Sequence, residues 1–590
     1  MEAVAIVGGV LDHLAIGVFA PFLGGEGVGR RDEREQGGGE DQAGEAGMVF
    51  MHGASVGERA AGGKGKKEAL TSGRGAISMR AMNRAWKWAL LLAVVASPWL
   101  KGLSFPFLYD DIGMLPENPF WERPSNLGLV LTGQTLADPR VINGRRPAVL
   151  ATYFLDRALY GWQPAGWRVS SLLLHLGCVA LLAGLLWRLT GRAFLSAAAG
   201  VLFGLHPALS EAVHAPGFRA DVLCLFFVLA SLHGFLAARQ RAAVKRMGGG
   251  VCLVLALLSK ETAVAAPILL GALMFLFPAA FPEERRARLA ALAVCAGIAA
   301  GFFALWLALP ADLQAAGGSW NGESLRFPET LFSLPALWTR TLRLLLVPWP
   351  LNVTPAFEPV ASAASIRFAL GLGWLGACGW GAWRARRVAP AVSLGFGWLA
   401  IFFAPVSNLW PLLHPVADRY VYPLAPGFAV LAAWVLSHQS RAGRAGGLAA
   451  LASIYALLLM LRLGQWESAE KLWTAAYFQN PKSATAATWL GLLREEAGDA
   501  AGARAFYAAA VEANPHADSA WINGGILEGK AGNWAESERL LRRATEVRPE
   551  GADAWHNLAV CLARQGRARE AEVAAARASA RPPAYGSANP

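Results

Sequence analysis

The chain has 590 residues, of which 55% are hydrophobic and only 16% are charged, with 23 Trp and a formal net charge of +12. This charge content is low for a soluble protein and apolar runs recur along most of the sequence, so we expect an integral membrane protein with a soluble C-terminal module. Lys and Arg cluster in short loops between apolar runs, which argues against nucleic-acid binding. The six Cys stand singly without a CxxC pair, so no disulfide framework or zinc site is indicated.

Residues 1–80 are rich in Gly, Ala, Glu and Arg and hold no sustained apolar run after Leu23. Such a segment cannot bury enough apolar surface to fold, so disorder is expected over most of it. Met79 and Met82 stand just before a basic and apolar run, as a natural start would. We therefore interpret residues 1–80 as a disordered or mis-assigned N-terminal extension.

Residues 81–463 are predicted to form a multi-spanning membrane domain, because apolar runs suited to a hydrocarbon core of about 30 Å follow one another. The runs lie at 86–103, 168–187, 193–206, 220–238, 248–259, 262–278, 289–309, 366–383, 390–405, 420–437 and 446–462. Basic clusters in alternate loops, such as the one at Arg285, Arg286 and Arg288, orient the domain by the positive-inside rule. We expect about eleven spans, with the N-terminus inside and the C-terminus outside.

One apolar run, Leu331–Val347, carries Arg340 and Arg343 and does not fit this count. Counting it as a span would move the next basic cluster to the outer side. We expect instead an amphipathic helix on the outer membrane interface, with Trp338 and Trp349 as interfacial anchors.

Two adjacent carboxylates, Asp110 and Asp111, follow directly on the first apolar run. They stand where the chain leaves the bilayer, since a charge inside the hydrocarbon core is costly. The same orientation places further polar groups on this outer side: Arg145 and Arg146, the stretch from His206 to Arg219, Lys260 and Glu261, and the stretch from His414 to Arg419. Wet loops are polar in any protein, but two of the apolar runs are short enough to bring polar residues to membrane depth. A cavity at this face is therefore expected.

The C-terminal part carries a repeat with a period of 34 residues. The residues at this spacing are Pro481, Pro515, Pro549 and Pro583; Gly464, Gly498, Gly532 and Gly566; Ala476, Ala510, Ala544 and Ala578; and Trp521 and Trp555. Trp, Gly, Ala and Pro at this period are typical of tetratricopeptide repeats, so an α-solenoid is predicted at 464–584, followed by a tail at 585–590. A half repeat joins the solenoid to the last predicted span, and its surface is expected to bind a protein or peptide.

The membrane domain also carries short motifs in a fixed order: YDDIGMLPENP at 109–119, RRP at 145–147, LFGLHPALSEAVHAPGFRADVL at 202–223, SKE at 259–261 and ADRYVYPLAPGF at 417–428. With the repeats behind them, these motifs resemble the transmembrane and tetratricopeptide-repeat O-mannosyltransferases, a family of the glycosyltransferase-C superfamily. The resemblance covers about residues 86–584. The chain departs from the family pattern at Arg168, Ser171 and Leu209, where the family often has His, Asn and His.

The resemblance implies a glycosyltransferase-C helix bundle and a polyprenyl-phosphate sugar donor at the outer leaflet. Transfer to a hydroxyl needs a carboxylate that accepts or orients the hydroxyl proton, and Asp110 or Asp111 is the candidate catalytic residue. Only one of the two is expected to serve, because adjacent residues in an extended loop point in different directions. The other is expected to bind a divalent metal or to cap the following helix. A helix cap or a solvated acidic loop without catalytic role is the structural alternative.

The leaving lipid phosphate needs fixed cations, and the candidates are Arg146, Arg219, Lys260 and Arg419. Each of these can instead be an interfacial cation that extends toward water. His206 and Glu211 are expected to orient the sugar, although a His before Pro is often a helix-end residue bonded to backbone. Glu261 is expected to join this site or to neutralise Lys260.

These expectations combine into one hypothesis for an all-α protein: transfer of a hexose, expected to be mannose, from a polyprenyl-phosphate carrier to Ser or Thr of a protein held by the repeats. One alternative is a non-catalytic membrane scaffold whose repeats recruit envelope proteins. Another is the same enzyme type with a glycan or lipid acceptor. The composition favours a bacterial inner membrane, with the site and the repeats outside the cytoplasm.

Overall fold

The computed structural model describes residues 86–580, with gaps at 139–140, 142, 237–241, 282–283, 309–327, 410–411 and 413. The described residues are helical or irregular and include no strand, which confirms the predicted all-α fold class. The predicted extension (1–80) and tail (585–590) lie outside them. The chain divides into two units, Met1–Leu91 and Leu92–Pro590. Of the first unit, residues 86–91 are described and are helical.

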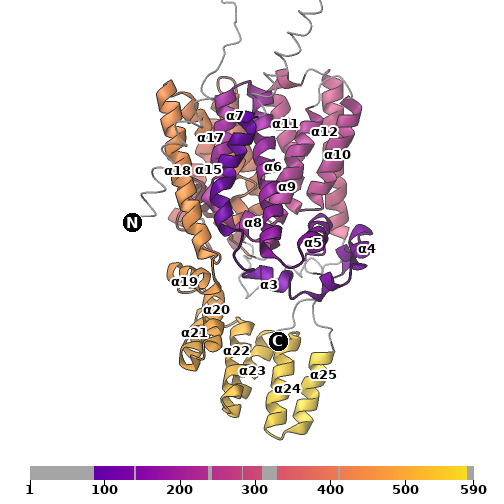
Figure 1. Cartoon of the computed structure of the whole chain (residues 1–590), viewed down its shortest axis with the longest axis vertical. Helices are drawn as coiled ribbons and strands as arrows, with labels where there is room; N and C mark the ends of the chain where they lie inside the picture. The colour runs from indigo at the N-terminus through magenta and orange to yellow at the C-terminus, as the bar shows by residue number, and fades with distance from the viewer. Residues whose placement is uncertain are drawn as a thin grey trace, which may run out of the picture. The chain divides into compact units, whose positions relative to one another are not determined.

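In the second unit, a bundle of helices precedes the repeats in the chain (Figure 1). Its longer helices are α5 (Pro147–Tyr160), α6 (Pro164–Thr190), α7 (Ala193–Gly204), α9 (Ala220–Phe235), α10 (Ala242–Leu257), α11 (Ala266–Leu276), α12 (Arg285–Ala308), α14 (Glu329–Leu346), α15 (Ile366–Ala385), α16 (Pro390–Phe403), α17 (Ala425–Ser437) and α18 (Arg441–Gln465). Several of them begin with Pro in the first turn, among them α5, α6, α16 and α17. The N–H groups of the first turn have no acceptor within the helix, so a proline there costs no intrahelical hydrogen bond.

Short elements connect these helices. They are η1 (Ser97–Gly102), α3 (Asp110–Met114), η2 (Pro119–Glu122), α4 (Asn126–Leu131), η3 (Gln134–Ala137), η4 (Pro207–Leu209), α8 (Ser210–His214), η5 (Pro216–Phe218), η6 (Glu261–Ala265), η7 (Pro278–Ala280), η9 (Ala404–Val406) and η10 (Asp418–Val421). Helix α3 contacts η5, η5 contacts α8, and α8 contacts η10. Figure 1 shows α3 and α8 toward the end of the bundle that leads into α19.

Three described helices are long and apolar enough to cross a membrane: α6, α12 and α18. A fourth span results if α7 and the segment Pro207–His214, which meet at a bend of 53°, act as one broken span. The expected count of about eleven spans is not confirmed, because most of the apolar runs fold into helices that are too short or not apolar enough. The twelve residues of α7, for example, rise only about 18 Å, against a hydrocarbon core of about 30 Å.

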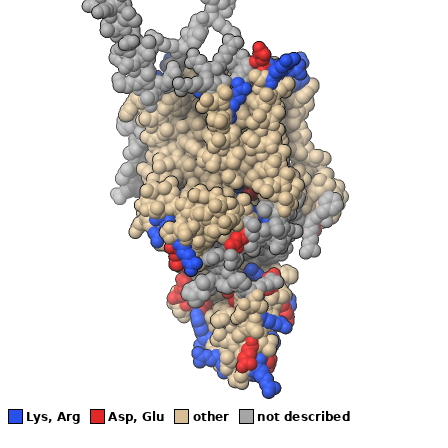
Figure 2. Space-filling view, turned by 90° about the vertical axis from the view of Figure 1, so that its right-hand side faces the viewer, with Lys and Arg blue, Asp and Glu red and all other residues tan. Residues whose placement is uncertain are grey.

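The surface of the bundle nevertheless has the character of a membrane protein. On the face shown in Figure 2, a broad band is nearly free of Lys, Arg, Asp and Glu, and charged residues gather at its two ends. Large apolar side chains such as Leu173, Ile268, Leu305 and Trp380 are exposed on the helices. Exposed apolar surface of this extent indicates contact with lipid.

The helix predicted to lie on the membrane interface packs against protein. Trp338 of α14 is fully buried and meets Phe403 edge-on, with ring centroids 5.0 Å apart. The prediction that Trp338 is an interfacial anchor is therefore wrong, because its indole fills the core of the bundle. Arg340 is likewise bound by protein, since its Nη2 lies 2.6 Å from Asp418 Oδ1. Trp349 is 37% exposed and its anchoring role stays a prediction.

The C-terminal helices form the predicted solenoid. After α19 (Ala469–Gln479) come three helix pairs: α20 (Ala484–Glu496) with α21 (Ala500–Ala513), α22 (Asp518–Lys530) with α23 (Trp534–Val547), and α24 (Ala552–Arg564) with α25 (Ala568–Ser579). This succession confirms the tetratricopeptide repeats. The first three of these helices, α19, α20 and α21, begin with a side-chain cap, as where Ser483 accepts a hydrogen bond from the amide of Ala486.

The 34-residue spacing has a local physical cause. Gly498, Gly532 and Gly566 occupy the turn inside each helix pair with φ values of +79°, +83° and +78°. This left-handed region is favourable for glycine and strained for other residues. Trp521 and Trp555 close the turn between successive pairs, because their Nε1 groups donate to the carbonyls of Pro515 and Pro549, at 3.0 and 2.7 Å.

Candidate active site

The two predicted catalytic acids follow a segment that a buried arginine fixes in place. Arg168 of α6 is 2% exposed, and its guanidinium donates to the carbonyls of Leu103, Phe105 and Pro106, the last at 2.6 Å. Its Nε donates to the carbonyl of His214 at 3.1 Å. A guanidinium offers five donors in a rigid fork, so one side chain can hold several carbonyls at once. Arg168 therefore determines how the chain approaches the acids.

Tyr109, directly before the acids, has a backbone conformation that is rare for a residue with a side chain. Its φ and ψ are 57° and −132°, and its side chain is 5% exposed. The ring packs edge-on against Trp473 of α19, with centroids 5.3 Å apart, and also contacts Phe218 at 5.8 Å. Such conformations persist only where the surrounding packing fixes them. The first solenoid helix is thus part of the wall of this site.

A second contact joins the solenoid to the same region. Asn352 donates from its side chain to the carbonyl of Ala476 in α19 at 3.0 Å, and its backbone N–H donates to Asp418 Oδ2 at 2.8 Å. Asp418 is the residue before Arg419 in η10. One asparagine therefore links α19 to the element that carries a predicted phosphate-binding cation.

The two carboxylates have different surroundings. Asp111 is 1% exposed, and its Oδ1 accepts a hydrogen bond of 2.7 Å from the backbone N–H of Gly217. Asp110 is partly exposed and has no hydrogen-bond partner among the described residues. Burial raises the pKa of Asp110 to about 6, against the opposing charge of Arg419. Burial raises the pKa of Asp111 to about 7, against the hydrogen bond from Gly217. Both carboxyls therefore titrate near neutrality.

Each of the four predicted phosphate-binding cations has a carboxylate partner. Arg419 Nη1 lies 2.5 Å from Glu211 Oε1, Lys260 Nζ lies 2.7 Å from both oxygens of Asp221, and Arg146 Nη2 lies 3.2 Å from Glu261 Oε1. The first two pairs are buried, whereas the side chains of Arg146 and Glu261 are 30% and 40% exposed. A carboxylate partner holds a cation in place without using all of its donors.

The ring of Tyr420 is the common neighbour of this cluster. Lys260 Nζ and Arg419 Cζ each lie 5.5 Å from its centroid, within range of cation–π attraction. Tyr420 also interacts electrostatically with Asp221, Glu261 and Arg146. The structure thus brings Arg146, Lys260 and Arg419 into one neighbourhood, which we call the cation cluster.

Arg219 and His206 contact other residues than the cation cluster does. Arg219 is fully buried, with Nη2 lying 2.5 Å from Asp156 Oδ2 and Nε donating to Ser171 Oγ at 2.9 Å. Its interaction with Asp111 is electrostatic, because its positive charge lowers the pKa of that carboxyl. His206 Nε2 lies 3.0 Å from the carbonyl of Leu345, and Nδ1 accepts from the N–H of Ala208 at the start of η4. These contacts fit the alternative of a helix-end histidine, and donor binding by either residue stays a prediction.

Sequence reasoning did not single out several residues of this region. They are Asp156, Asp221, Tyr420 and Arg168. Arg168 was noted only as a departure from the family pattern. Asp221 is the only acid in the apolar run 220–238, and an isolated acid there signals a buried partner. Asp156 stands beside Arg157 and gives no such signal. The signal at Asp221 was available in the sequence, whereas the carbonyl partners of Arg168 depend on tertiary structure.

A divalent metal stays a prediction. Among the residues that the structure describes, no group of three or more His, Cys, Asp and Glu side chains is placed to hold a metal ion. A Mg²⁺ ion is commonly bound by one or two carboxylates together with substrate phosphates. Asp110 and Asp111 would be the protein ligands in that arrangement.

The buried pair Arg219–Asp156 and the half-exposed pair Arg146–Glu261 should contribute differently to the free energy of unfolding. Replacing Arg219 by Gln leaves Asp156 buried without a cation and should lower the free energy of unfolding by about 3–5 kcal/mol. Replacing Arg146 by Gln breaks a half-exposed pair and should cost about 1 kcal/mol or less. Apparent melting temperatures of the purified proteins in detergent check this. Equal shifts for both variants would contradict the structural role of Arg219.

Comparison with known proteins supports the motif resemblance. A family model described as "Tetratricopeptide repeat" matches residues 458–518 and 523–587. The chain is 25% identical over 476 residues to "Protein O-mannosyl-transferase TMTC4" of Homo sapiens, a match that covers 67% of this chain and 62% of that protein. It is 30% identical over 189 residues to "Protein O-mannosyl-transferase Tmtc1" of Drosophila melanogaster, covering 29% of this chain and 21% of that protein.

Among solved structures, the chain is similar to ArnT from Cupriavidus metallidurans bound to undecaprenyl phosphate. The TM-score is 0.37 at 16% identity, with 83% of this chain and 74% of that chain covered. The match to the human relative spans 62% of that relative's length. In its sequence relatives, its ordered motifs and its helical repeats, the chain is similar to the transmembrane and tetratricopeptide-repeat O-mannosyltransferases.

Proposed function

We propose that this chain is a membrane glycosyltransferase that moves a hexose, with mannose the expected sugar, from a polyprenyl-phosphate carrier to a Ser or Thr hydroxyl of a protein. The observation that carries the proposal is the position of Asp110. This carboxylate is partly exposed, titrates near neutrality and interacts with Arg419 of the cation cluster. The printed names of the sequence relatives support mannosyl transfer to protein.

In the proposed reaction, Asp110 acts as general base. The acceptor oxygen forms a bond with the anomeric carbon while its proton passes to Asp110. The bond between the anomeric carbon and the phosphate oxygen breaks, and the electron pair leaves with the lipid phosphate. A base whose pKa lies near the working pH is effective, because it is ionised yet still basic enough to take the proton.

Asp111 is proposed to position the site instead of transferring the proton. Its Oδ1 is held by the N–H of Gly217, and a Cβ added at Gly217 would lie only 2.9 Å from that oxygen. The close approach therefore depends on glycine at this position. A carboxylate fixed in this way keeps α3, and with it Asp110, against η5.

The cation cluster is proposed to stabilise the leaving phosphate. Negative charge grows on the phosphate as the glycosidic bond breaks, and fixed cations aimed at it lower the barrier. Arg146 is the most exposed of the three, and it retains donors beyond those directed at Glu261 and Asn143. Lys260 and Arg419 are held by their carboxylates, so they need little reorganisation during the reaction.

The solenoid is proposed to hold the acceptor polypeptide beside this site. Its first helix contacts Tyr109 through Trp473, so a polypeptide bound along the repeats starts close to Asp110. Tethering raises the effective concentration of the acceptor at the site. The location proposed for both parts is the outer side of the membrane, in a bacterium the periplasmic side of the inner membrane.

Substitution of the acids tests the assignment directly. Asp110→Asn should lower transfer by a factor of roughly 10²–10⁴, since it removes the base and keeps the shape. Asp111→Asn should have a smaller effect because its amide oxygen can still accept from Gly217. Glycopeptide mass spectrometry of an acceptor incubated with membranes and donor measures transfer, with the exposed Glu122→Gln as control. Full activity in the Asp110→Asn, Asp111→Asn double variant would refute the site.

The pH dependence follows from the raised pKa of Asp110. The base works only when ionised, so kcat/KM should be constant above neutrality and fall as the pH drops through about 6. The fall should be about tenfold per pH unit on the acid side for a single group. The Asp111→Asn variant should keep this inflection. An inflection that moves or disappears in that variant would assign the proton transfer to Asp111 instead.

A shortened solenoid tests the acceptor proposal. Removing residues 515–590 deletes α22 to α25 but keeps α19, α20 and α21, and with them the packing around Tyr109. Transfer to a folded or long protein acceptor should fall about 10²-fold or more. Transfer to a short Ser/Thr peptide should change little and serves as the control. Undiminished transfer to the protein acceptor would favour a glycan or lipid acceptor.

A further inference from the structure

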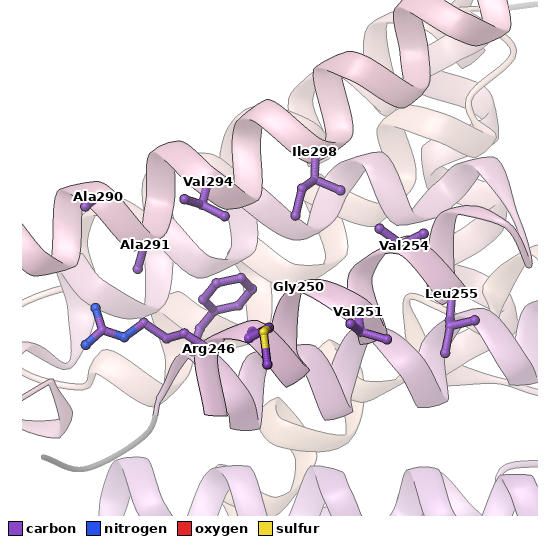
Figure 3. A pocket seen from close by; sticks show the side chains of 11 residues that line it. Arg246, Gly250, Val251, Val254, Leu255, Ala290, Ala291, Val294 and Ile298 are labelled. Carbon is purple, nitrogen blue, oxygen red and sulfur yellow. The ribbon is translucent and has the colours of Figure 1, made fainter. Parts of the chain in front are cut away.

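A groove of about 600 Å³ runs between α10 and α12, and neither Asp110 nor Asp111 is among its lining residues (Figure 3). Its lining is apolar apart from a single charged residue, Arg246. Figure 3 shows Arg246 beside Ala290 and Ala291 at one end, and Val254 near Ile298 toward the other. The volume is in the range of about 300–1,000 Å³ that is typical of sites for small molecules.

Small residues keep this groove open. A Cβ added at Gly250 would meet only Ile298 Cδ1, at 3.5 Å, and the facing residues Ala290 and Ala291 are also small. Three of the larger lining residues are exposed, Met247 by 68%, Val251 by 56% and Val294 by 55%, whereas Phe235 is buried. Because α12 is long and apolar enough to cross a membrane, this exposed surface is expected to face lipid and not water.

The length of the groove fits one leaflet. Along α10 the lining extends from Arg246 to Leu255, which at 1.5 Å per residue is about 14 Å. Half of a hydrocarbon core of about 30 Å is about 15 Å. An acyl chain entering at the Arg246 end would therefore lie along the groove to about the middle of the bilayer.

The end that carries Arg246 is rich in cations. Lys245 precedes Arg246, and Arg285, Arg286 and Arg288 form the start of α12, with Glu284 as the acid beside them. Charge complementarity at this end favours an anionic headgroup. We propose that the groove binds an anionic phospholipid, with one acyl chain between α10 and α12 and the phosphate at Arg246.

The sugar donor is a different ligand from this lipid. Along the chain, Arg246 precedes Lys260 of the cation cluster by fourteen positions, which in helical conformation is a rise of about 20 Å. A phosphate at Arg246 would be remote from Asp110 and its neighbours. The proposed lipid is thus a structural ligand, and its binding does not depend on the proposed transfer reaction.

Native mass spectrometry of the full chain in neutral detergent tests this proposal. The probes are dioleoyl phosphatidylglycerol, dioleoyl phosphatidylcholine and a polyprenyl phosphate, added singly. Wild-type protein should retain phosphatidylglycerol over phosphatidylcholine. Arg246→Gln should reduce that preference roughly fivefold, as expected for one cation at a lipid surface. Arg286→Gln, a change in the same basic region outside the lining, is the matched control and should reduce it less.

Filling the groove separates the acyl-chain contact from the charge. Gly250→Leu should lower retention of both phospholipids at this site while Arg246 stays in place. If Gly250→Leu did not fold, Val251→Trp, at an exposed position of the same groove, would give the same readout. Equal retention of the two phospholipids by wild type, equal effects of Arg246→Gln and Arg286→Gln, retention of the polyprenyl phosphate alone, or a lipid-free dimer would each overturn the proposal.

Discussion

The packing of Trp473 against Tyr109 is the interaction on which the arrangement of this molecule depends. Tyr109 holds a backbone conformation that costs about 1–3 kcal/mol, and an aromatic pair by itself contributes only about 0.5–1.5 kcal/mol. Burial of the whole indole, however, removes about 200 Å² from water and stabilises by about 5 kcal/mol. Trp473 is fully buried, so its packing outweighs the local strain next to the acids.

This contact also joins the start of the repeats to the segment that carries the two acids. Leu108, Tyr109 and Phe218 share a buried cluster with residues of α19 and α20, including Trp473 and Leu490. A solenoid that merely followed the last span on a flexible linker would leave the distance between acceptor and acids undefined. Here the same apolar cluster stabilises the start of the solenoid and the segment that precedes Asp110, so one interaction serves both fold and proposed chemistry.

The charged groups follow a second constraint, the cost of burying an unpaired charge. Arg219, Lys260 and Arg419 lie at or near full burial, and each is paired with a carboxylate. Pairing lowers the desolvation cost but does not remove it, so such pairs are weak evidence for stability alone. For Lys260 and Arg419, the proposed stabilisation of a leaving phosphate gives a further reason for fixed cations. The α10–α12 groove adds a contrasting case, in which a cation stands at the end of an apolar surface that lipid can cover.

The sequence by itself determined the features that depend on local pattern. Periodic Gly, Trp and Pro specified the repeats, because the turn inside each helix pair needs a positive φ and Trp bonds the carbonyl of Pro. Low charge and apolar runs specified a membrane bundle, and ordered motifs pointed to Asp110, Lys260 and Arg419. Tertiary structure alone decided which cation meets which acid, that Trp338 fills a core, and that Arg168 fixes the segment before the acids. These outcomes depend on contacts between residues far apart in the chain, and spacing along the sequence carries no information about such distances.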